Sequence, residues 1–264
     1  MSFIDFSFWR GMVTIRMALL QTSFFSPTLI KNVAMNLIVP ESVDGPYHVL
    51  FLLHGLSDDH SKWMRMSSIE RYADGYPLIV VMPDGGRNFY QDGVQSARYG
   101  TMIGRELPQL IRRWFPVKPD FAISGLSMGG YGSLRLAFDY PEVFRSVWAM
   151  SGALEFGTEG DYDRMESFPR EFHHIIEVAE SGSVADLFKI AERATNLPKI
   201  GFDCGTEDWL IESNRKFHLH LRSLEIPHEY HEHPGGHDWA YWDTHIKDAL
   251  EFHATSLGFT GPNG

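Results

Sequence analysis

Cysteine is nearly absent from this chain: its 264 residues include a single one, Cys204, which excludes an intrachain disulfide framework. The apolar residues before Cys204 predict a buried strand, in which the thiol packs and takes no part in chemistry. No apolar run approaches the length of a transmembrane helix. Charged residues interrupt the N-terminal segment, which also lacks the cleavage site of a secretory signal. We therefore expect a cytoplasmic protein.

Basic residues are in the minority. Lysine and arginine total 23, against 34 aspartate and glutamate residues, which gives a formal net charge of −11. This excess of negative charge disfavours nucleic acids and anionic membranes as partners. A small molecule is the expected partner, and the composition does not decide whether the chain forms a homo-oligomer.

Linkers, low-complexity tracts and internal repeats are missing as well. Apolar residues make up 44% of the chain and recur at regular intervals from Met17 to Phe252, which is enough for one substantial core. We therefore predict a single domain over residues 17–264.

Short apolar runs predict seven strands. Most of the runs are continuously apolar, as is typical of a parallel sheet that is covered on both faces. The expected strands are Val33–Val39, His48–Leu53, Leu78–Met82, Phe121–Ser124, Val147–Met150, Lys199–Cys204 and His228–Glu232.

Helical patterns alternate with these strands. Apolar residues recur at helical spacing over residues 103–114, 210–224 and 239–250. Pro108 should make the first of these helices kink or begin late. The alternation of strands and helices predicts an α/β fold with right-handed crossovers.

One segment, Glu155–Asn196, breaks this rhythm. It contains several glycines and a proline, followed by two helix-like stretches, the second of which (residues 184–194) Ser183 would cap. Two interpretations remain open: an inserted helical cap that shapes a substrate pocket, or a longer crossover connection.

The most specific motif is Gly125-Leu126-Ser127-Met128-Gly129, a Gly-x-Ser-x-Gly pattern. An apolar segment precedes it and a helix-like segment follows, so the serine would lie at a sharp turn from a strand into a helix. Glycines two residues on either side avoid side-chain clashes at such a turn. This context favours Ser127 as a catalytic nucleophile over an incidental serine in a tight turn.

A serine nucleophile needs a histidine base and a carboxylate that orients the histidine. Asp208 lies beyond the end of the strand Lys199–Cys204 and is the first candidate for the acid. Glu207 beside it, and Asp203 within the strand, remain alternatives. A Pro-Gly-Gly run ends the last strand and would present His237 in a tight loop before the final helix, although His237 could instead cap that helix.

The oxyanion that forms in acyl transfer needs two hydrogen-bond donors. The amide of Met128, directly after the nucleophile, would be one of them. The loop after the strand His48–Leu53 would supply the amide of Leu56 as the other. His54, in the same loop, is expected to support it or to contact substrate, and Tyr90, in a later turn-rich loop, to form a wall of the pocket.

Four histidines, His228, His231, His233 and His237, lie close together in the sequence and raise the question of a zinc site. Their spacing fits no common zinc pattern, and strand alternation would point His228 away from His231 and His233. We therefore expect neither a metal nor an organic cofactor.

Five short motifs follow one another along the chain: Leu53-His54-Gly55-Leu56, Met82-Pro83-Asp84-Gly85, Gly125-Leu126-Ser127-Met128-Gly129-Gly130, Gly205-Thr206-Glu207-Asp208 and Gly236-His237-Asp238. Together they resemble the esterase D branch of the α/β-hydrolases, and within it the tributyrin-esterase-like carboxylesterases. The resemblance covers about residues 17–252. It implies a mostly parallel sheet flanked by helices. Of the two interpretations of Glu155–Asn196, we predict the small helical cap, over about residues 155–196. Residues 1–16 fall outside it and are expected to form an N-terminal extension, or to arise from an upstream start codon.

For the site, the resemblance implies a triad of Ser127, Asp208 and His237, with the amides of Leu56 and Met128 as oxyanion donors. The expected function is that of a serine carboxylesterase that hydrolyses short-chain acyl esters through an acyl-enzyme intermediate.

Several alternatives remain open. The family that the chain resembles also includes feruloyl and acetyl-xylan esterases, S-formylglutathione hydrolases and acyltransferases. Ser57 and Asp58 stand where the formylglutathione enzymes usually carry threonine and cysteine, which argues against that activity. A binding protein without activity could use the same scaffold, although the complete set of serine, acid and histidine argues against it.

Overall fold

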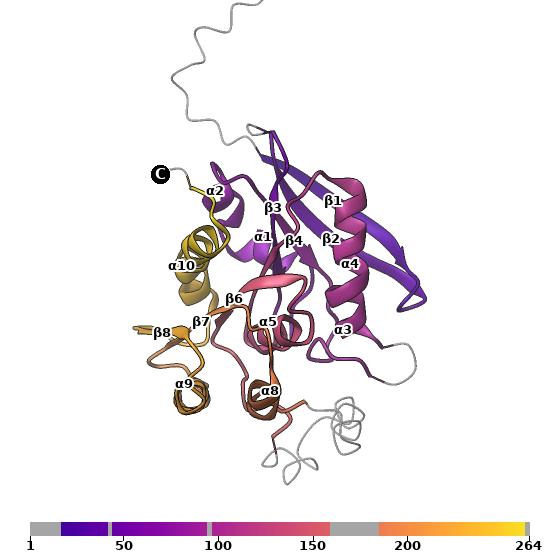
Figure 1. Cartoon of the computed structure of the whole chain (residues 1–264). Helices are drawn as coiled ribbons and strands as arrows, with labels where there is room; N and C mark the ends of the chain where they lie inside the picture. Colours follow the sequence, from indigo (N-terminus) through magenta and orange to yellow (C-terminus); the bar gives the residue numbers. More distant parts are fainter. Residues whose placement is uncertain (1–16, 42–43, 94–96, 159–184, 262–264) are drawn as a thin grey trace, which may run out of the picture.

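The computed structural model describes residues 17–41, 44–93, 97–158 and 185–261 (Figure 1). In this part of the chain, eight strands form one sheet in the order β1-β2-β4-β3-β5-β6-β7-β8. The strands are β1 (Met17–Ser26), β2 (Lys31–Pro40), β3 (His48–Leu53), β4 (Leu78–Pro83), β5 (Phe121–Leu126), β6 (Phe144–Met150), β7 (Lys199–Gly205) and β8 (His228–His233). Strand β2 is antiparallel to both β1 and β4, and all other neighbours are parallel. The expectation of an α/β fold with a mostly parallel sheet is confirmed.

All seven expected strands are present, but β1 was not predicted. It pairs with β2 over its whole length and lies at the edge of the sheet. Its side chains mix buried and exposed positions, with Leu19, Leu20 and Phe25 exposed. A search for continuously apolar runs misses such a strand, because only one of its faces is buried.

Helices connect the strands and cover the sheet. They are α1 (Lys62–Met66), α2 (Ile69–Ala73), α3 (Tyr99–Thr101), the π-helix η2 (Met102–Glu106), α4 (Leu107–Trp114), α5 (Met128–Asp139), α8 (Leu187–Arg193), α9 (Ile211–Ser223) and α10 (Trp239–Leu257). The expected late start at Pro108 is wrong, because α3, η2 and α4 follow one another without a break from Tyr99 to Trp114. Pro108 is the second residue of α4, directly after the π-helical turn η2. None of the described helices is long and apolar enough to span a membrane.

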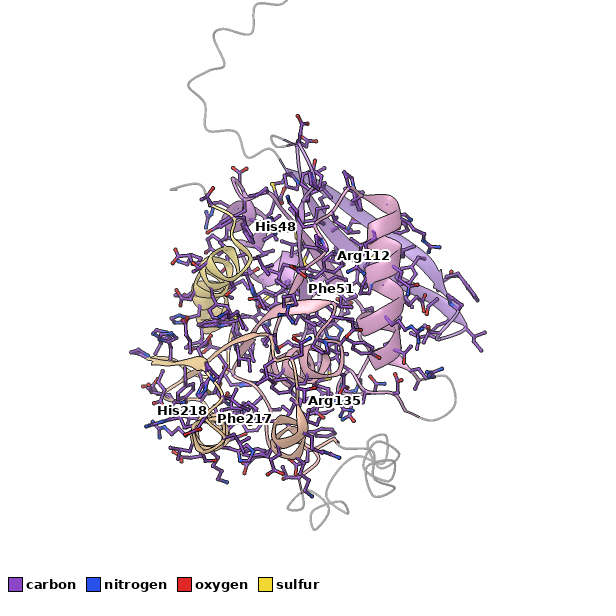
Figure 2. The ribbon with its side chains drawn as sticks, in the orientation of Figure 1. His48, Phe51, Arg112, Arg135, Phe217 and His218 are labelled. Atoms are coloured by element: carbon purple, nitrogen blue, oxygen red, sulfur yellow. The ribbon has the colours of Figure 1, made fainter. Side chains whose placement is uncertain are left out.

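The helices form one layer on each face of the sheet (Figure 1). Side chains of α4, α5, α8 and α9 pack on one face, and those of α1, α2 and α10 pack on the other. In the first of these cores, Phe51 contacts Phe121 and Phe144, with ring centroids 5.8 and 5.5 Å apart. Figure 2 shows Phe51 in the interior of the molecule. Cys204 is fully buried in β7, as expected.

The segment Glu155–Asn196 is described only in part. Residues 159–184, which include Ser183, lie outside the described residues, so the helical cap remains a prediction. Within the described part, α8 begins later than expected. Its N-cap is Asp186, whose carboxylate accepts hydrogen bonds from the amides of Phe188 and Lys189. The expected extension, residues 1–16, also lies outside the described residues.

The carboxyl ends of the parallel strands meet at one edge of the sheet, where an α/β protein places its ligand sites. The loops that leave β3, β4, β5, β7 and β8 at this edge carry the five sequence motifs.

Candidate active site

Ser127 lies in the turn between β5 and α5. Its backbone has φ 54° and ψ −116°, a conformation that costs free energy for any residue with a side chain. Its N–H donates to the carbonyl of Met150 at the end of β6, 2.9 Å away, which holds the turn in place. The expected strand-to-helix turn is therefore present, with the serine at its tip.

Glycine is required next to this turn because α5 begins in contact with the neighbouring strand. A Cβ on Gly129 would lie 2.7 Å from the carbonyl oxygens of both Leu53 and His54, closer than real Cβ contacts allow. A Cβ on Gly125 would in turn collide with the carbonyl of Gly129. The two glycines of the motif thus allow the helix to approach the sheet directly behind Ser127.

The structure brings together the three residues predicted as a triad. His237 Nε2 lies 3.0 Å from Ser127 Oγ, and His237 Nδ1 lies 2.8 and 3.1 Å from the two carboxylate oxygens of Asp208. Nδ1–H therefore donates to Asp208, which leaves the Nε2 lone pair to accept from the serine hydroxyl. This is the arrangement that activates a serine nucleophile.

Asp208 is buried and ionised. Burial alone would raise the pKa of its carboxyl, but hydrogen bonds from His237 and from the Leu210 amide outweigh burial and lower the pKa. The charged carboxylate thus fixes the orientation and tautomer of the imidazole.

The two alternative acids have other partners. Glu207 accepts a hydrogen bond from the amide of Gly235 and so braces the loop that carries His237. Asp203 is buried in β7, where it accepts hydrogen bonds from Trp148 Nε1 and the Tyr241 hydroxyl. Of the three acids, Asp208 is the one in contact with His237.

Two indole rings enclose the His237 imidazole. Trp209 and Trp242 have ring centroids 5.1 and 4.9 Å from that of His237, and only 17% of the histidine side chain is exposed. Asp238, not His237, caps α10, since its carboxylate accepts a hydrogen bond from the Tyr241 amide. The imidazole is thus held in place and left available for proton transfer.

The two candidate oxyanion donors flank Ser127. Met128 is the first residue of α5, and Leu56 follows β3 in a loop that abuts the nucleophile. A Cβ placed on Gly55 would lie 3.8 Å from the Cβ of Ser127. Both Leu56 and Met128 line the same cavity as Ser127.

His54 lies behind this cavity rather than in it. Its side chain is buried, Nε2 accepts from the Gly85 amide at 2.9 Å, and Nδ1–H donates to the Gly55 carbonyl at 2.8 Å. The ring therefore joins the loops that follow β3 and β4. Of its two expected roles, His54 therefore has the first, support of the loop. It is not among the residues that line the cavity.

The expectation for Tyr90 is corrected. Tyr90 is fully buried and its hydroxyl donates to the His54 carbonyl at 2.8 Å, while the residue before it, Phe89, lines the cavity. Phe89 and Tyr90 both have positive φ values, 55° and 56°. Two consecutive residues in the left-handed region turn the chain sharply. As a result Phe89, and not Tyr90, lies at the cavity wall.

The cavity over Ser127 has a volume of about 700 Å³. Its walls are rich in aromatic rings, with Asp58, Lys62, Arg87 and Asp238 as charged residues among the lining. The aromatic residues are Phe89, Trp209, Trp239 and Trp242.

Sequence reasoning missed the role of these aromatic residues. Trp209 directly follows Asp208, and Trp239 comes two residues after His237, so their positions beside two triad candidates were a usable signal. Helical periodicity instead assigned Trp239 and Trp242 to the core, which is correct for one part of each ring and incomplete.

The histidines of β8 divide between the two faces of the sheet, as strand alternation predicted. The ring of His228 contacts His218 of α9, whereas His231 stacks on Trp148 and His233 stacks on His245 of α10. His237 lies in the cavity, so the four histidines do not share a site.

Comparisons with known proteins identify the family. The Esterase family model, described as "Putative esterase", matches residues 26–253. An acetyl esterase of Caldicellulosiruptor saccharolyticus is 31% identical over 262 residues, which cover 89% of this chain and 98% of that protein.

Two solved structures from Staphylococcus aureus have the same fold. The fluorophosphonate-binding serine hydrolase FphF aligns with a TM-score of 0.80 and 27% identity, and the S-formylglutathione hydrolase FrmB with a TM-score of 0.79 and 29% identity. Each alignment covers 89% of this chain and 98% of the other. The resemblance to the esterase D branch is confirmed: the chain belongs to the Esterase family of α/β-hydrolases and is an enzyme that hydrolyses carboxylic esters.

Proposed function

We propose that the protein is a serine esterase in which Ser127, His237 and Asp208 form the catalytic triad, and that it acts on short-chain acyl esters. The observation that carries the proposal is the continuous hydrogen-bonded series from Ser127 Oγ through the His237 imidazole to the Asp208 carboxylate, at the wall of a cavity. Such a series is what nucleophilic acyl transfer needs.

In the first half of the reaction, His237 Nε2 takes the proton of Ser127 Oγ as the oxygen attacks the ester carbonyl carbon. The amides of Leu56 and Met128 donate to the oxyanion of the tetrahedral intermediate. Asp208 stabilises the imidazolium, which then gives its proton to the leaving alkoxide. The alcohol departs and the acyl group stays on Ser127.

In the second half, a water molecule takes the place of the alcohol. His237 removes one of its protons while the water oxygen attacks the acyl carbon, and the same two amides again hold the oxyanion. Collapse of the intermediate breaks the bond to Ser127 Oγ, which recovers its proton from His237. The acid is released and the enzyme returns to its starting state.

The preference for short acyl groups is supported by the acetyl esterase relative and by the walls of the cavity. Four aromatic rings around a cavity of about 700 Å³ suit a small apolar ester.

The same rings favour a second candidate, an esterase for aromatic acids such as a feruloyl esterase. Trp209 is 73% exposed beside His237 and lines the cavity, so a flat aromatic acyl group would find a stacking partner. Aromatic acyl groups are therefore the alternative to acetyl and butyryl groups.

Steady-state kinetics with p-nitrophenyl acetate, butyrate and octanoate, and with methyl ferulate, tests both candidates. We expect kcat/KM to be highest for acetate and butyrate and to fall for octanoate. Ser127→Ala should lose about 10⁴-fold or more in kcat. A higher kcat/KM for methyl ferulate would favour the second candidate, and retained activity in Ser127→Ala would refute the proposed nucleophile.

A further inference from the structure

A second group of ligand-type side chains lies between the end of β8 and α10. His233 is the last residue of β8, and His245 and Asp248 lie three residues apart on α10. Asp248 Oδ2 is 2.7 Å from His245 Nδ1 and 4.0 Å from His233 Nε2. One donor atom from each of the three residues falls within 4.8 Å of the other two.

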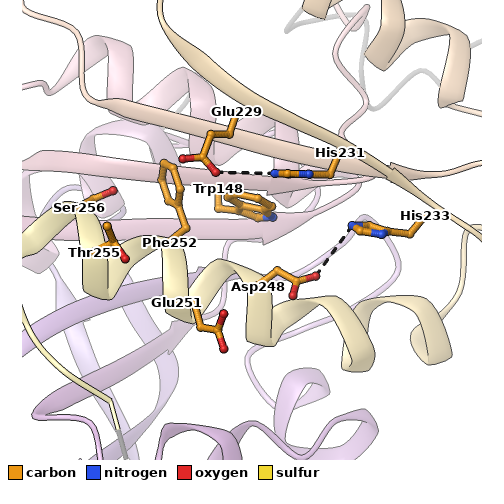
Figure 3. A pocket seen from close by; sticks show the side chains of 9 residues that line it. All are labelled: Trp148, Glu229, His231, His233, Asp248, Glu251, Phe252, Thr255 and Ser256. Atoms are coloured by element: carbon orange, nitrogen blue, oxygen red, sulfur yellow. Dashed lines mark ion pairs between the residues drawn. The ribbon is translucent and has the colours of Figure 1, made fainter. Parts of the chain in front are cut away.

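Two of the three residues, His233 and Asp248, border a surface pocket (Figure 3). In the figure His233 of β8 and Asp248 of α10 point toward each other across it, with His231 and Glu229 beside them. The pocket has a volume of about 350 Å³, which gives water molecules access to the His233 and Asp248 side chains. Glu229, Asp248 and Glu251 make its lining acidic, which favours a cation.

We propose that His233, His245 and Asp248 bind a divalent transition metal ion such as Zn²⁺. Two imidazole nitrogens and one carboxylate oxygen suit Zn²⁺, Ni²⁺ or Cu²⁺, whereas Mg²⁺ and Ca²⁺ prefer a shell made of oxygen atoms. Water from the pocket completes the shell, so the site has three protein ligands and an open position.

The geometry needs only side-chain motion to close around an ion. Bonds of about 2.0–2.2 Å place the ligand atoms of one zinc ion roughly 3–3.5 Å apart. His233 and Asp248 are 33% and 46% exposed, so both side chains can turn, while His245 is held by its contact with the Tyr241 ring at 4.4 Å. Binding rotates the His233 ring out of its stack on His245, where the ring centroids are 4.1 Å apart.

The position of the site suggests what the ion does. His233 and His245 lie on either side of the loop 234–238, which carries His237 and leads into α10. An ion bound to both ties the end of β8 to α10 and so fixes the two ends of this loop. The ion is a structural cross-link outside the catalytic cavity and takes part in no step of the reaction.

Isothermal titration of the untagged, chelator-treated protein with ZnCl₂, and separately with NiCl₂, tests the site. We expect one high-affinity ion per chain, and a melting temperature that rises with metal in the wild type. His245→Ala and Asp248→Asn should each weaken binding at least about tenfold and reduce the metal-dependent rise. Asp248→Asn keeps the size of a surface side chain, so its fold is preserved for the measurement.

Two variants serve as controls. His218→Ala removes a histidine from the separate pair that His218 forms with His228, and His237→Ala removes the imidazole of the catalytic cavity. Both should bind the ion with the affinity of the wild type. Absence of binding, or an equal loss of affinity in His218→Ala or His237→Ala, would overturn the site.

Discussion

At the residue scale, the candidate triad depends on one carboxylate among three neighbours. Asp203, Glu207 and Asp208 lie within six positions of each other, yet each has a different partner: the Trp148 and Tyr241 side chains, the Gly235 amide, and the His237 imidazole. The end of β7 decides between them, because Asp203 is still inside the strand and Asp208 lies in the loop beyond it.

Exchanging the Asp208 carboxylate for an amide should remove most of the activity. Asp208→Asn keeps the shape of the side chain but no longer fixes the tautomer of His237 or stabilises the imidazolium, so we expect kcat to fall by roughly 10⁴-fold with little change in KM. Steady-state hydrolysis of p-nitrophenyl butyrate measures both constants.

The matched control is Glu207→Gln, since the glutamine oxygen can still accept from the Gly235 amide. It should keep kcat within a few-fold of the wild type. If the two variants lost activity equally, Asp208 would have no special place in the triad.

Sequence reasoning named residues that the structure brings into contact where the chemistry requires a fixed chain order, and it named the wrong wall residue where the backbone takes an unusual conformation. Ser127, Asp208 and His237 could be named because each follows a recognisable strand end. The exchange of Phe89 for Tyr90 at the cavity wall could not be foreseen, because nothing in their side chains signals two consecutive positive φ angles.

At the element scale, the turn from β5 into α5 shows why small residues surround the nucleophile. The carbonyls of Leu53 and His54, from β3 and the loop after it, approach Gly129 so closely that no side chain fits. The glycines of the Gly-x-Ser-x-Gly motif are therefore needed for the packing of α5 against β3, in addition to marking the candidate nucleophile.

Gly129→Ala should destabilise the protein. The new methyl group would lie 2.7 Å from two backbone oxygens that cannot move without shifting β3, so we expect the free energy of unfolding to fall by about 1–3 kcal/mol. Urea denaturation measures this change.

Gly236→Ala provides the comparison, because its Cβ would meet its nearest neighbour at 3.8 Å, an ordinary contact distance. It should change the free energy of unfolding by less than about 1 kcal/mol. Similar losses in the two alanine variants would contradict the close approach of α5 to β3.

Elements in the middle of the sheet were predictable because both of their faces are buried and their runs are continuously apolar. Strand β1, at the edge, was not, because its exposed face carries no such run. Helix ends were harder to predict than helix positions. Asp186 provides the capping carboxylate of α8, whereas the sequence pattern favoured Ser183.

At the scale of the whole molecule, two buried groups should give the stability opposite responses to pH. His253 is fully buried between the hydroxyls of Ser124 and Ser146, and burial lowers its pKa to about 3. Burial also raises the pKa of Asp203 to about 7, against the hydrogen bonds from Tyr241 and Trp148.

The direction of each effect on stability follows from the protons that the unfolded chain binds. Below its ordinary pKa of 6.5, unfolded His253 binds a proton that the folded protein excludes, so stability falls as the pH falls toward 3. Above its ordinary pKa of 3.8, unfolded Asp203 loses a proton that the folded protein keeps, so stability falls as the pH rises toward 7. Between these limits the two effects oppose each other.

Single variants should separate the two effects. Relative to the wild type, the free energy of unfolding of Asp203→Asn should rise with pH more steeply, and that of His253→Gln less steeply, each by about 1.4 kcal/mol per pH unit. Urea denaturation at a series of values between about pH 4.5 and 6.5 gives the slopes. Parallel slopes for all three proteins would show that these groups titrate alike in the folded and unfolded chains.

The most direct test of the account is the site of covalent reaction. Incubation of the intact protein with a fluorophosphonate, followed by digestion and mass spectrometry, should locate a single adduct on Ser127. The adduct should be absent from Ser127→Ala and should form far more slowly in His237→Ala, which lacks the base. An adduct on another residue, or labelling of Ser127→Ala to the level of the wild type, would contradict the assignment of Ser127 as the nucleophile.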